Sequence, residues 1–149
     1  MKDAQFGQLH KFFVYGTLQR GEVRERYWPR APLAVESAYA LARLHDLGPY
    51  PAIVAGSDRV RGELWILAPE DMPATVAALD EVEGYNQGGS DWYIRRAIAC
   101  WTLDGGEHQA YTYYWGEGQD IRHTPIVPPG PDGYVDWKRW KGERRRENG

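Results

Sequence analysis

Residues 11–21 read KFFVYGTLQRG, an apolar and aromatic run that stops abruptly at a glycine. The run at 11–15 is short and consists mainly of β-branched and aromatic residues, which predicts a buried β-strand. Gly16 and Gly21 frame the loop that follows. A glycine at a strand end lets successive backbone N–H groups point into one concavity, which can bind a carboxylate or phosphate without a cationic side chain. We therefore predict an anion-binding turn formed by Gly16, Thr17 and Leu18.

The rest of the chain is predicted to be rich in short strands. One helix is expected over residues 70–84, where Met72, Val76, Leu79 and Val82 form an apolar stripe and Gly84 provides a stop. Further strands are expected at 33–44, 52–55, 59–67, 92–102 and 108–115, the last two as a hairpin, and a short helix at 22–28. Repeated βαβ units are missing. The pattern indicates a β-rich α+β domain, for which a barrel is one arrangement.

Length and charge indicate how the chain is organised. Its 149 residues fit a single domain spanning 1–149, in which 116–149 form an extended, Pro/Trp-rich and basic C-terminal segment. Residues 138–149 carry six basic and two acidic side chains, and the rest of the chain has a net charge of −7. Such a basic end is more often a solvated tail than a binding element. The acidic body disfavours binding to nucleic acid.

Several classes of protein are disfavoured by composition. The longest apolar candidate, at 33–42, contains Glu36 and Ser37, so no membrane span is expected. The first eight residues are polar and do not resemble a secretory signal. A single cysteine, Cys100, excludes an internal disulfide, and its position within a predicted strand favours a buried, inert thiol. A cytoplasmic location fits this pattern.

Cofactor and metal sites are not indicated either. The four histidines lie far apart and have no paired ligand spacing. Gly16 and Gly21 have the glycine spacing of a phosphate loop, but Glu22 stands where that motif requires lysine. We therefore expect no metal ion and no cofactor.

The end of the predicted helix, LDEVEGY at 79–85, carries three carboxylates. Asp80 and Glu81 are expected to be solvated. Glu83 lies four positions after Leu79, beside the apolar stripe, and is expected to turn inward. Apolar surroundings disfavour an ionised carboxylate and would raise its pKa towards neutrality, as an acid/base catalyst requires. The alternative is a surface glutamate on a fraying turn.

Five segments in order resemble the γ-glutamylcyclotransferase-like (AIG2-like) family. FVYGTL at 13–18 is similar to the family's YGTL or YGSN signature, and LDEVEGY at 79–85 to the motif that carries its catalytic glutamate. The other three are HDLGPYPAI at 45–53, RGELW at 61–65 and YTY at 111–113. The match runs from about Phe12 to Trp115, and the segment after Gly116 has no counterpart that we can assign.

The resemblance implies a small mixed β-barrel of five to six strands with one main flanking helix. It also implies cleavage of a γ-glutamyl amide by its own α-amine, which releases 5-oxoproline and an amine or amino acid. The catalytic acid/base would be Glu83. The substrate-binding residues would be Tyr15, Gly16, Thr17, Leu18, Gly48, Tyr50 and Tyr113, although Tyr50 could equally brace the loop. The only partner expected is a small γ-glutamyl molecule, and the protein could be a monomer or a homodimer.

Two other functions remain open at this point. The same fold could be a non-catalytic module that binds a small ligand or a protein partner. An aromatic barrel could instead stack single-stranded nucleic acid on platforms such as Trp92, Trp101, Tyr113 and Trp115. If the enzyme assignment holds, the polar loop at 84–91 is expected to border the pocket, because it directly follows Glu83.

Overall fold

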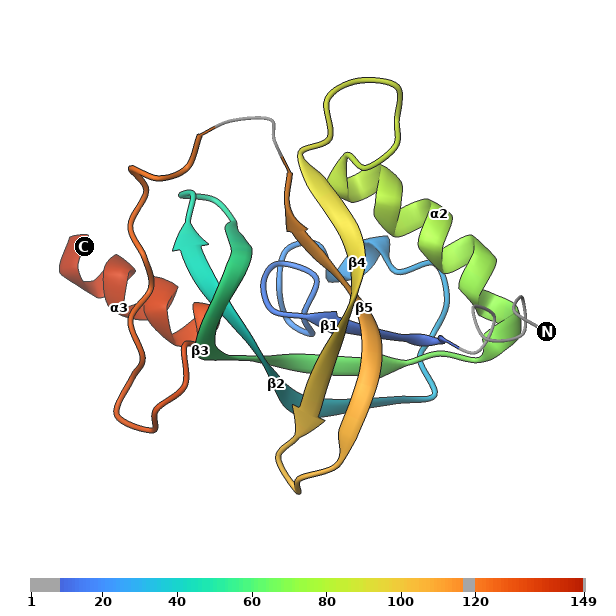
Figure 1. Cartoon of the computed structure of the whole chain (residues 1–149), viewed down its shortest axis with the longest axis horizontal. Helices are drawn as coiled ribbons and strands as arrows, with labels where there is room; N and C mark the ends of the chain where they lie inside the picture. The colour runs from blue at the N-terminus through green and yellow to red at the C-terminus, as the bar shows by residue number, and fades with distance from the viewer. Residues whose placement is uncertain (1–8, 117–119, 149) are drawn as a thin grey trace.

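The computed structural model describes residues 9–116 and 120–148. Five strands form a closed barrel in the order β1-β3-β2-β4-β5 (Figure 1). They are β1 (Lys11–Val14), β2 (Ala34–Asp46), β3 (Pro51–Ile66), β4 (Tyr93–Thr102) and β5 (Glu107–Trp115). Neighbours pair antiparallel, except that β5 runs parallel to β1 and also to β3, so the barrel is mixed as predicted. Within the described ranges, no helix is long and apolar enough to cross a bilayer.

One long strand replaces the two that the sequence predicted at 52–55 and 59–67. Strand β3 pairs with β2 along its whole length, but the register shifts between Ala42 and Arg43, whose partners are Asp58 and Val54. The intervening residues of β3 form a bulge, so the turn-like residues there do not end the strand. Gly56 lies in this bulge, where a Cβ atom would come within 2.8 Å of the Arg43 backbone nitrogen.

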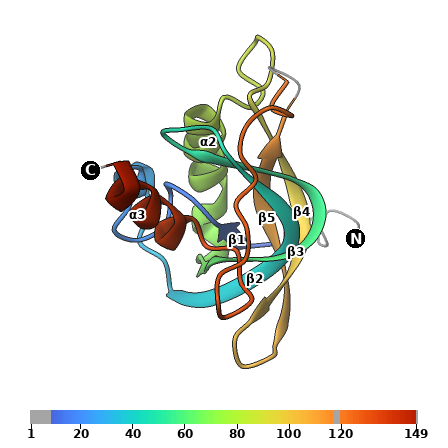
Figure 2. The same cartoon turned by 90° about the vertical axis from the view of Figure 1, so that its left-hand side faces the viewer.

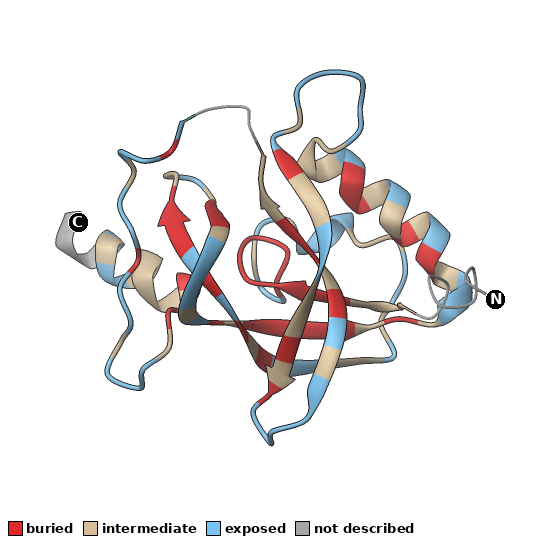
Figure 3. Ribbon diagram, in the orientation of Figure 1, coloured by how far each residue is buried: buried red, intermediate tan, exposed pale blue. Residues whose placement is uncertain are grey.

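Two apolar clusters lie on opposite faces of the sheet. Alternation along β1 sends Phe13 into the cluster that contains Leu44, Leu64 and Cys100, and sends Phe12 into the cluster that packs under helix α2. Figure 3 shows buried segments along every strand. The Cys100 thiol is fully buried, as predicted, and burial raises its pKa to about 11.

Helix α2 (Met72–Glu83) follows a short 3₁₀ helix, η2 (Pro69–Asp71), and ends at Gly84. Gly84 has a left-handed φ of 70°, and its N–H donates to the last carbonyls of the helix. The predicted helix was therefore placed correctly, with its first residues forming η2. Its buried face differs in part from the predicted stripe, because Thr75 and Asp80 are buried with Met72 and Leu79.

The helix predicted at 22–28 is reduced to one 3₁₀ turn, η1 (Glu25–Tyr27). Gly21, which lies four residues before η1, has a left-handed φ of 82°. Trp28, which precedes Pro29, follows η1 in an extended conformation. A residue before proline is disfavoured in the helical region, which explains why no further turn forms.

The C-terminal segment ends in a helix that the sequence analysis did not predict. Residues 120–136 run along the barrel, and α3 (Trp137–Asn148) then packs against its side (Figure 2). Asp136 caps α3 by accepting hydrogen bonds from the backbone N–H groups of Lys138 and Arg139. The expectation of an extended segment is therefore wrong for residues 137–148, which are helical.

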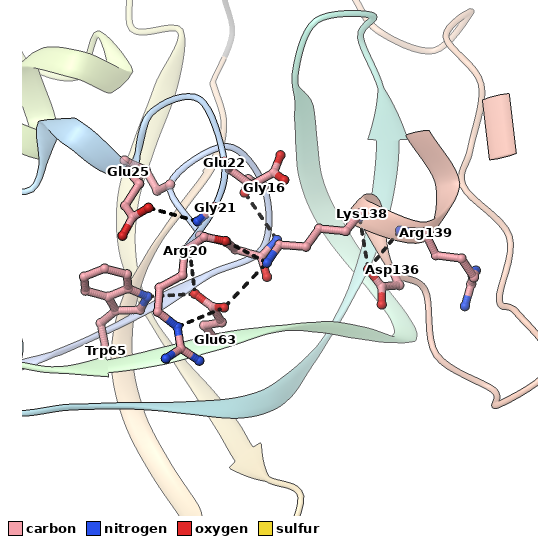
Figure 4. Close-up of polar contacts among 12 residues, drawn as sticks. Gly16, Arg20, Gly21, Glu22, Glu25, Glu63, Trp65, Asp136, Lys138 and Arg139 are labelled. Carbon is pink, nitrogen blue, oxygen red and sulfur yellow. Dashed lines mark hydrogen bonds and ion pairs between the residues drawn. The ribbon is translucent and has the colours of Figure 1, made fainter. Parts of the chain in front are cut away.

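Spacing explains why α3 is docked. Residues three and four apart on a helix share a face, and on α3 that face carries the buried Trp137 and three cations. The cations form ion pairs with carboxylates of the barrel and its loops: Lys138 with Glu63, Lys141 with Glu22 and Arg144 with Asp46. Figure 4 shows Lys138 reaching the loop at residues 16–25.

Candidate active site

A pocket opens where β1 ends. Counted together with the adjoining open solvent, its empty space amounts to about 330 Å³. Its walls come from β1 and the turn that follows it, from Arg24, which precedes η1, from β4 and β5, and from Glu83, the last residue of α2. The residues that define its chemistry are Tyr15, Gly16, Thr17, Leu18, Arg24, Glu83, Tyr93 and Tyr113.

The turn at Gly16–Leu18 forms one wall of the pocket. A Cβ atom on Gly16 would lie 2.6 Å from Cγ of Pro51, so only glycine lets the turn pack against that ring. The Gln19 N–H donates to the Gly16 carbonyl at 3.2 Å. In the described part of the chain, no protein acceptor takes a hydrogen bond from the N–H groups of Gly16, Thr17 or Leu18. These three amides are therefore uncommitted donors beside the pocket.

Glu83, the last residue of α2, lines the same pocket as this turn. Its side chain is only 10% exposed, which confirms the predicted inward orientation. Burial raises the pKa of Glu83 from its ordinary value of 4.5 to about 7, and the nearby Arg24 guanidinium partly opposes the shift. At neutral pH such a group is present in both protonation states, so it can accept a proton and return it.

Arg24 is a pocket residue that the sequence analysis missed. Its Nη1 donates to Oε2 of Glu83 at 3.0 Å, and its backbone N–H donates to the Thr17 carbonyl at 2.8 Å. Its guanidinium carbon lies 5.3 Å from the centroid of the Tyr50 ring, a cation–π contact. Tyr50 therefore braces a pocket residue without itself lining the pocket. Arg24 lies in the short segment at 22–28, and no spacing or motif there indicated that its side chain would reach the pocket.

Tyrosine hydroxyls in and around the pocket are held by other groups. Tyr15 donates to the Tyr113 carbonyl at 2.6 Å, and Tyr93 donates to the Pro51 carbonyl at 2.8 Å. Tyr113 donates to Oδ1 of Asp80 at 2.6 Å. Burial raises the pKa of each of these three tyrosines, so all remain protonated at neutral pH.

Asp80 corrects another expectation. It was predicted to be solvated, but it is buried and accepts two hydrogen bonds from Arg95 at 2.9 and 3.2 Å besides that from Tyr113. The carboxylate thus positions Tyr113 against the pocket. No spacing rule connects Asp80 to Arg95 on β4, because their contact depends on how the helix packs against the barrel.

Two predicted elements of the site lie outside the pocket lining. Gly48 occupies the β2–β3 turn with φ of 103°, and its N–H donates to Oδ1 of Asp46 at 2.7 Å. Asp46 in turn binds Arg144 and the Trp140 indole of α3. The loop at 84–91 contributes no residue to this lining. The expectation that this loop borders the pocket is not met.

The aromatic side chains proposed as stacking platforms are mostly engaged within the protein. Tyr113 is buried, and Trp101 stacks on Tyr39 with ring centroids 5.5 Å apart. Trp92 is 45% exposed and contacts Trp115. Three basic side chains of the C-terminal helix are in ion pairs, as described above. These arrangements do not form a continuous row of open rings.

A family comparison agrees with this geometry. The model of the family described as "Gamma-glutamyl cyclotransferase, AIG2-like" matches residues 12–139. The chain belongs to this family. The matched region includes every pocket residue and reaches into α3.

A named relative and several solved structures are similar to this cyclotransferase-family chain. The γ-L-glutamyl-butirosin B γ-glutamyl cyclotransferase of Niallia circulans is 30% identical over 135 residues, which cover 89% of this chain and 78% of that protein. Among solved structures, an AIG2-like protein from Mus musculus has a TM-score of 0.55 at 20% identity, covering 86% of this chain and 95% of that one. YkqA from Bacillus subtilis has a TM-score of 0.65 at 21% identity, and the match covers 92% of this chain but 42% of YkqA. Both structures support the fold.

Among the described residues, no cluster of three or more His, Cys, Asp or Glu side chains is arranged to hold a metal ion.

The raised pKa of Glu83 predicts how the stability of this cyclotransferase-family chain depends on pH. The folded state holds the Glu83 proton more tightly than the unfolded chain, so this contribution to stability is present below about pH 4.5 and is lost as the pH rises through about 7. At about 1.36 kcal/mol per pH unit, the loss is about 3 kcal/mol. We expect Glu83→Gln to lack it, because the amide does not ionise and the partly exposed Arg24 can be solvated.

The measurement is urea unfolding of both proteins at pH 4.5 and pH 8. The free energy of unfolding of the wild type, relative to Glu83→Gln, should fall by about 3 kcal/mol between these pH values. Parallel pH dependences for the two proteins would contradict the assignment of a buried, neutral-range carboxyl at position 83.

Proposed function

We propose that this chain cleaves γ-glutamyl amides by intramolecular cyclisation, with Glu83 as the general acid/base. The Glu83 carboxylate takes a proton from the α-ammonium group of the substrate. The freed amine attacks the γ-carbonyl carbon, which forms the five-membered ring. The bond between that carbon and the departing nitrogen then breaks, and Glu83 returns the proton to the departing amine. The ring nitrogen gives up its second proton to the regenerated Glu83 carboxylate, which passes it on to the released amine, so that the amine leaves as an ammonium ion. The products are 5-oxoproline and an amine or amino acid.

The observation that carries the proposal is the placement of one buried carboxyl in the pocket beside three uncommitted amides. An α-amino group is mostly protonated at neutral pH and must lose a proton before it can attack. A carboxyl with a pKa of about 7 is well matched to that transfer in both directions. The Gly16–Leu18 turn lines the same pocket, and its N–H groups are the donors that the proposal uses.

Intramolecular attack reduces what the protein must supply. Because the amine and the carbonyl belong to one molecule, the pocket needs only to hold the folded conformer and exclude water. The negative charge that develops on the carbonyl oxygen requires donors placed in advance. We assign this role to the turn amides, since the Tyr113 hydroxyl is already donating to Asp80.

The class of leaving group is part of the proposal. The name of the Niallia circulans relative refers to a γ-glutamyl group carried by a larger molecule, which supports an amine larger than a single amino acid. The pocket here is open to solvent at its mouth, so a large amine could extend outward while the glutamyl part is enclosed. A binding module without catalysis remains the second candidate, and turnover distinguishes the two.

The pH dependence of activity follows from the same carboxyl. Only ionised Glu83 can accept the ammonium proton, so kcat/KM should rise with pH through an apparent pKa of about 7. The measurement is a profile of kcat/KM from pH 5 to pH 9 with one γ-glutamyl amide. An acidic limb near 4.5, as for an exposed glutamate, would contradict the assignment.

The proposed function is tested by incubating the protein with a panel of γ-glutamyl amides, including dipeptides, simple amines and amines larger than an amino acid, and assaying 5-oxoproline. The matched control is the same compound with its α-amine acetylated, which removes the nucleophile but keeps the amide. We expect product from at least one free-amine compound and none from its acetylated form. Silence across the panel would favour the binding module.

A further inference from the structure

We infer that Arg24 binds the α-carboxylate of the substrate, and that the Arg24–Glu83 pair recognises the zwitterionic head group of a γ-glutamyl compound. This inference rests on the proposed function and deepens it by naming a specificity determinant. Arg24 lines the pocket with Glu83, and nothing in the resemblance to the family pointed to it.

Arg24 has more donors than the protein uses. A guanidinium group offers five N–H donors in a planar fork. One of them, on Nη1, binds Glu83 at 3.0 Å. Across the residues that the structure describes, Nε and Nη2 of Arg24 have no side-chain or carbonyl acceptor. The side chain is 28% exposed, so this remaining edge is accessible to a ligand.

The position of Arg24 is fixed from two sides. Its backbone N–H is bound to the Thr17 carbonyl, which ties it to the turn that lines the same pocket. The Tyr50 ring supports its guanidinium through the cation–π contact at 5.3 Å. A side chain that served only as a surface counterion to Glu83 would need neither contact. These contacts hold the fork between the turn and the carboxyl.

The charges of the pair match those of the ligand. A γ-glutamyl head group carries an ammonium and a carboxylate on the same carbon atom, and Glu83 and Arg24 offer opposite charges 3.0 Å apart. When the ligand enters, Arg24 can move its hydrogen bonds to the carboxylate while Glu83 receives the ammonium. Every charge keeps a partner during this exchange, so no unpaired ion is left in the pocket.

Arg24 could have either of two roles, as the counterion of Glu83 or as the group that binds the α-carboxylate, and these roles can be distinguished. If Arg24 acted only as the counterion of Glu83, its removal would affect all substrates equally. If it binds the α-carboxylate, its removal penalises substrates that carry one more than substrates that lack one. A pair of compounds that differ at this group therefore distinguishes the roles.

The experiment compares a γ-glutamyl amide turned over by the wild type with its α-carboxamide analogue, in the wild type, Arg24→Gln, Arg24→Lys and Arg26→Gln. Arg26 is the matched control, because it lies two residues further on and its guanidinium contacts its neighbours Val23 and Tyr27 and is not part of the pocket lining. We expect the wild type to prefer the carboxylate by about 10- to 100-fold in kcat/KM, the range for a hydrogen bond to a charged group. Arg24→Gln should abolish the preference mainly through KM, Arg24→Lys should keep part of it, and Arg26→Gln should keep all of it.

Equal loss on both compounds in Arg24→Gln would overturn the inference. A second readout separates this failure from failure of the proposed function. Titration with 5-oxoproline and with 5-oxoprolinamide measures carboxylate binding without turnover. If the panel of amides is silent but 5-oxoproline binds the wild type and not Arg24→Gln, the carboxylate site stands and the enzyme proposal falls. If 5-oxoproline binds no better than its amide, or equally well to Arg24→Gln, the carboxylate site is wrong.

Discussion

If Glu83 is the general acid/base, as proposed, replacing it with glutamine should lower kcat by about 10²- to 10⁴-fold, the usual contribution of such a group. Glutamine keeps the shape of the side chain and an acceptor oxygen for Arg24, so the pocket should remain formed. What it loses is the ability to take the ammonium proton and return it to the leaving amine. The measurement is steady-state release of 5-oxoproline at pH 8.

The matched control is Glu81→Gln. Glu81 lies on the same helix two residues earlier, but its side chain is exposed and is not part of this pocket. We expect this variant to retain wild-type turnover, since surface substitutions away from special contacts have small effects. Turnover that survives Glu83→Gln, or that falls equally in both variants, would remove Glu83 from the mechanism.

Replacing Trp137 with alanine should reduce the free energy of unfolding by about 3–5 kcal/mol, the cost of truncating a large buried aromatic side chain. Trp137 is 1% exposed and packs in the same cluster as Phe13 and Leu64, so its ring fixes α3 to the barrel. Denaturant unfolding at pH 6 measures the loss.

Trp137→Phe is the matched control for this substitution. Among the described residues, the Trp137 indole N–H is a buried donor without a hydrogen-bond partner. Phenylalanine removes that unpaired donor while filling most of the space, so we expect a loss well below that of alanine. Equal losses for the two variants would show that the indole makes a contact that packing does not explain.

The docking of α3 also supports the loop that begins with the pocket turn. Lys138 on α3 donates to the Arg20 carbonyl at 2.9 Å, next to the pocket turn, and pairs with Glu63 (Figure 4). Glu63 also accepts the Arg20 N–H at 2.9 Å and the Trp65 indole N–H at 3.1 Å. The loop that supplies the pocket amides is therefore held at its far end by the barrel and by α3. Loss of α3 docking should reduce activity along with stability.

Local signals in the sequence predicted a large part of the fold and of the site. The apolar run before Gly16 specified β1 and its turn, because a strand followed by glycine is a short-range pattern. The spacing from Leu79 to Glu83 specified the inward carboxyl for the same reason, since one helical turn fixes both residues. Both predictions depended on neighbours along the chain.

The features that were missed depend on contacts between distant segments. The pairing of Arg24 with Glu83 joins the residue that precedes η1 to the end of α2. The pairing of Asp80 with Arg95 joins α2 to β4. Helix α3 has a highly polar sequence, and it is stabilised by ion pairs to Glu22, Glu63 and Asp46 that no local pattern shows. The bulge that unites β3 likewise follows from its register with β2.

The most direct test of cyclisation is to run the reaction in water enriched in ¹⁸O and identify the acidic product by mass spectrometry. Attack by the α-amine predicts 5-oxoproline with no ¹⁸O, because no water oxygen enters the product, and an equal amount of released amine. Glutamate that carries one ¹⁸O atom would show that water is the nucleophile, and it would contradict the account.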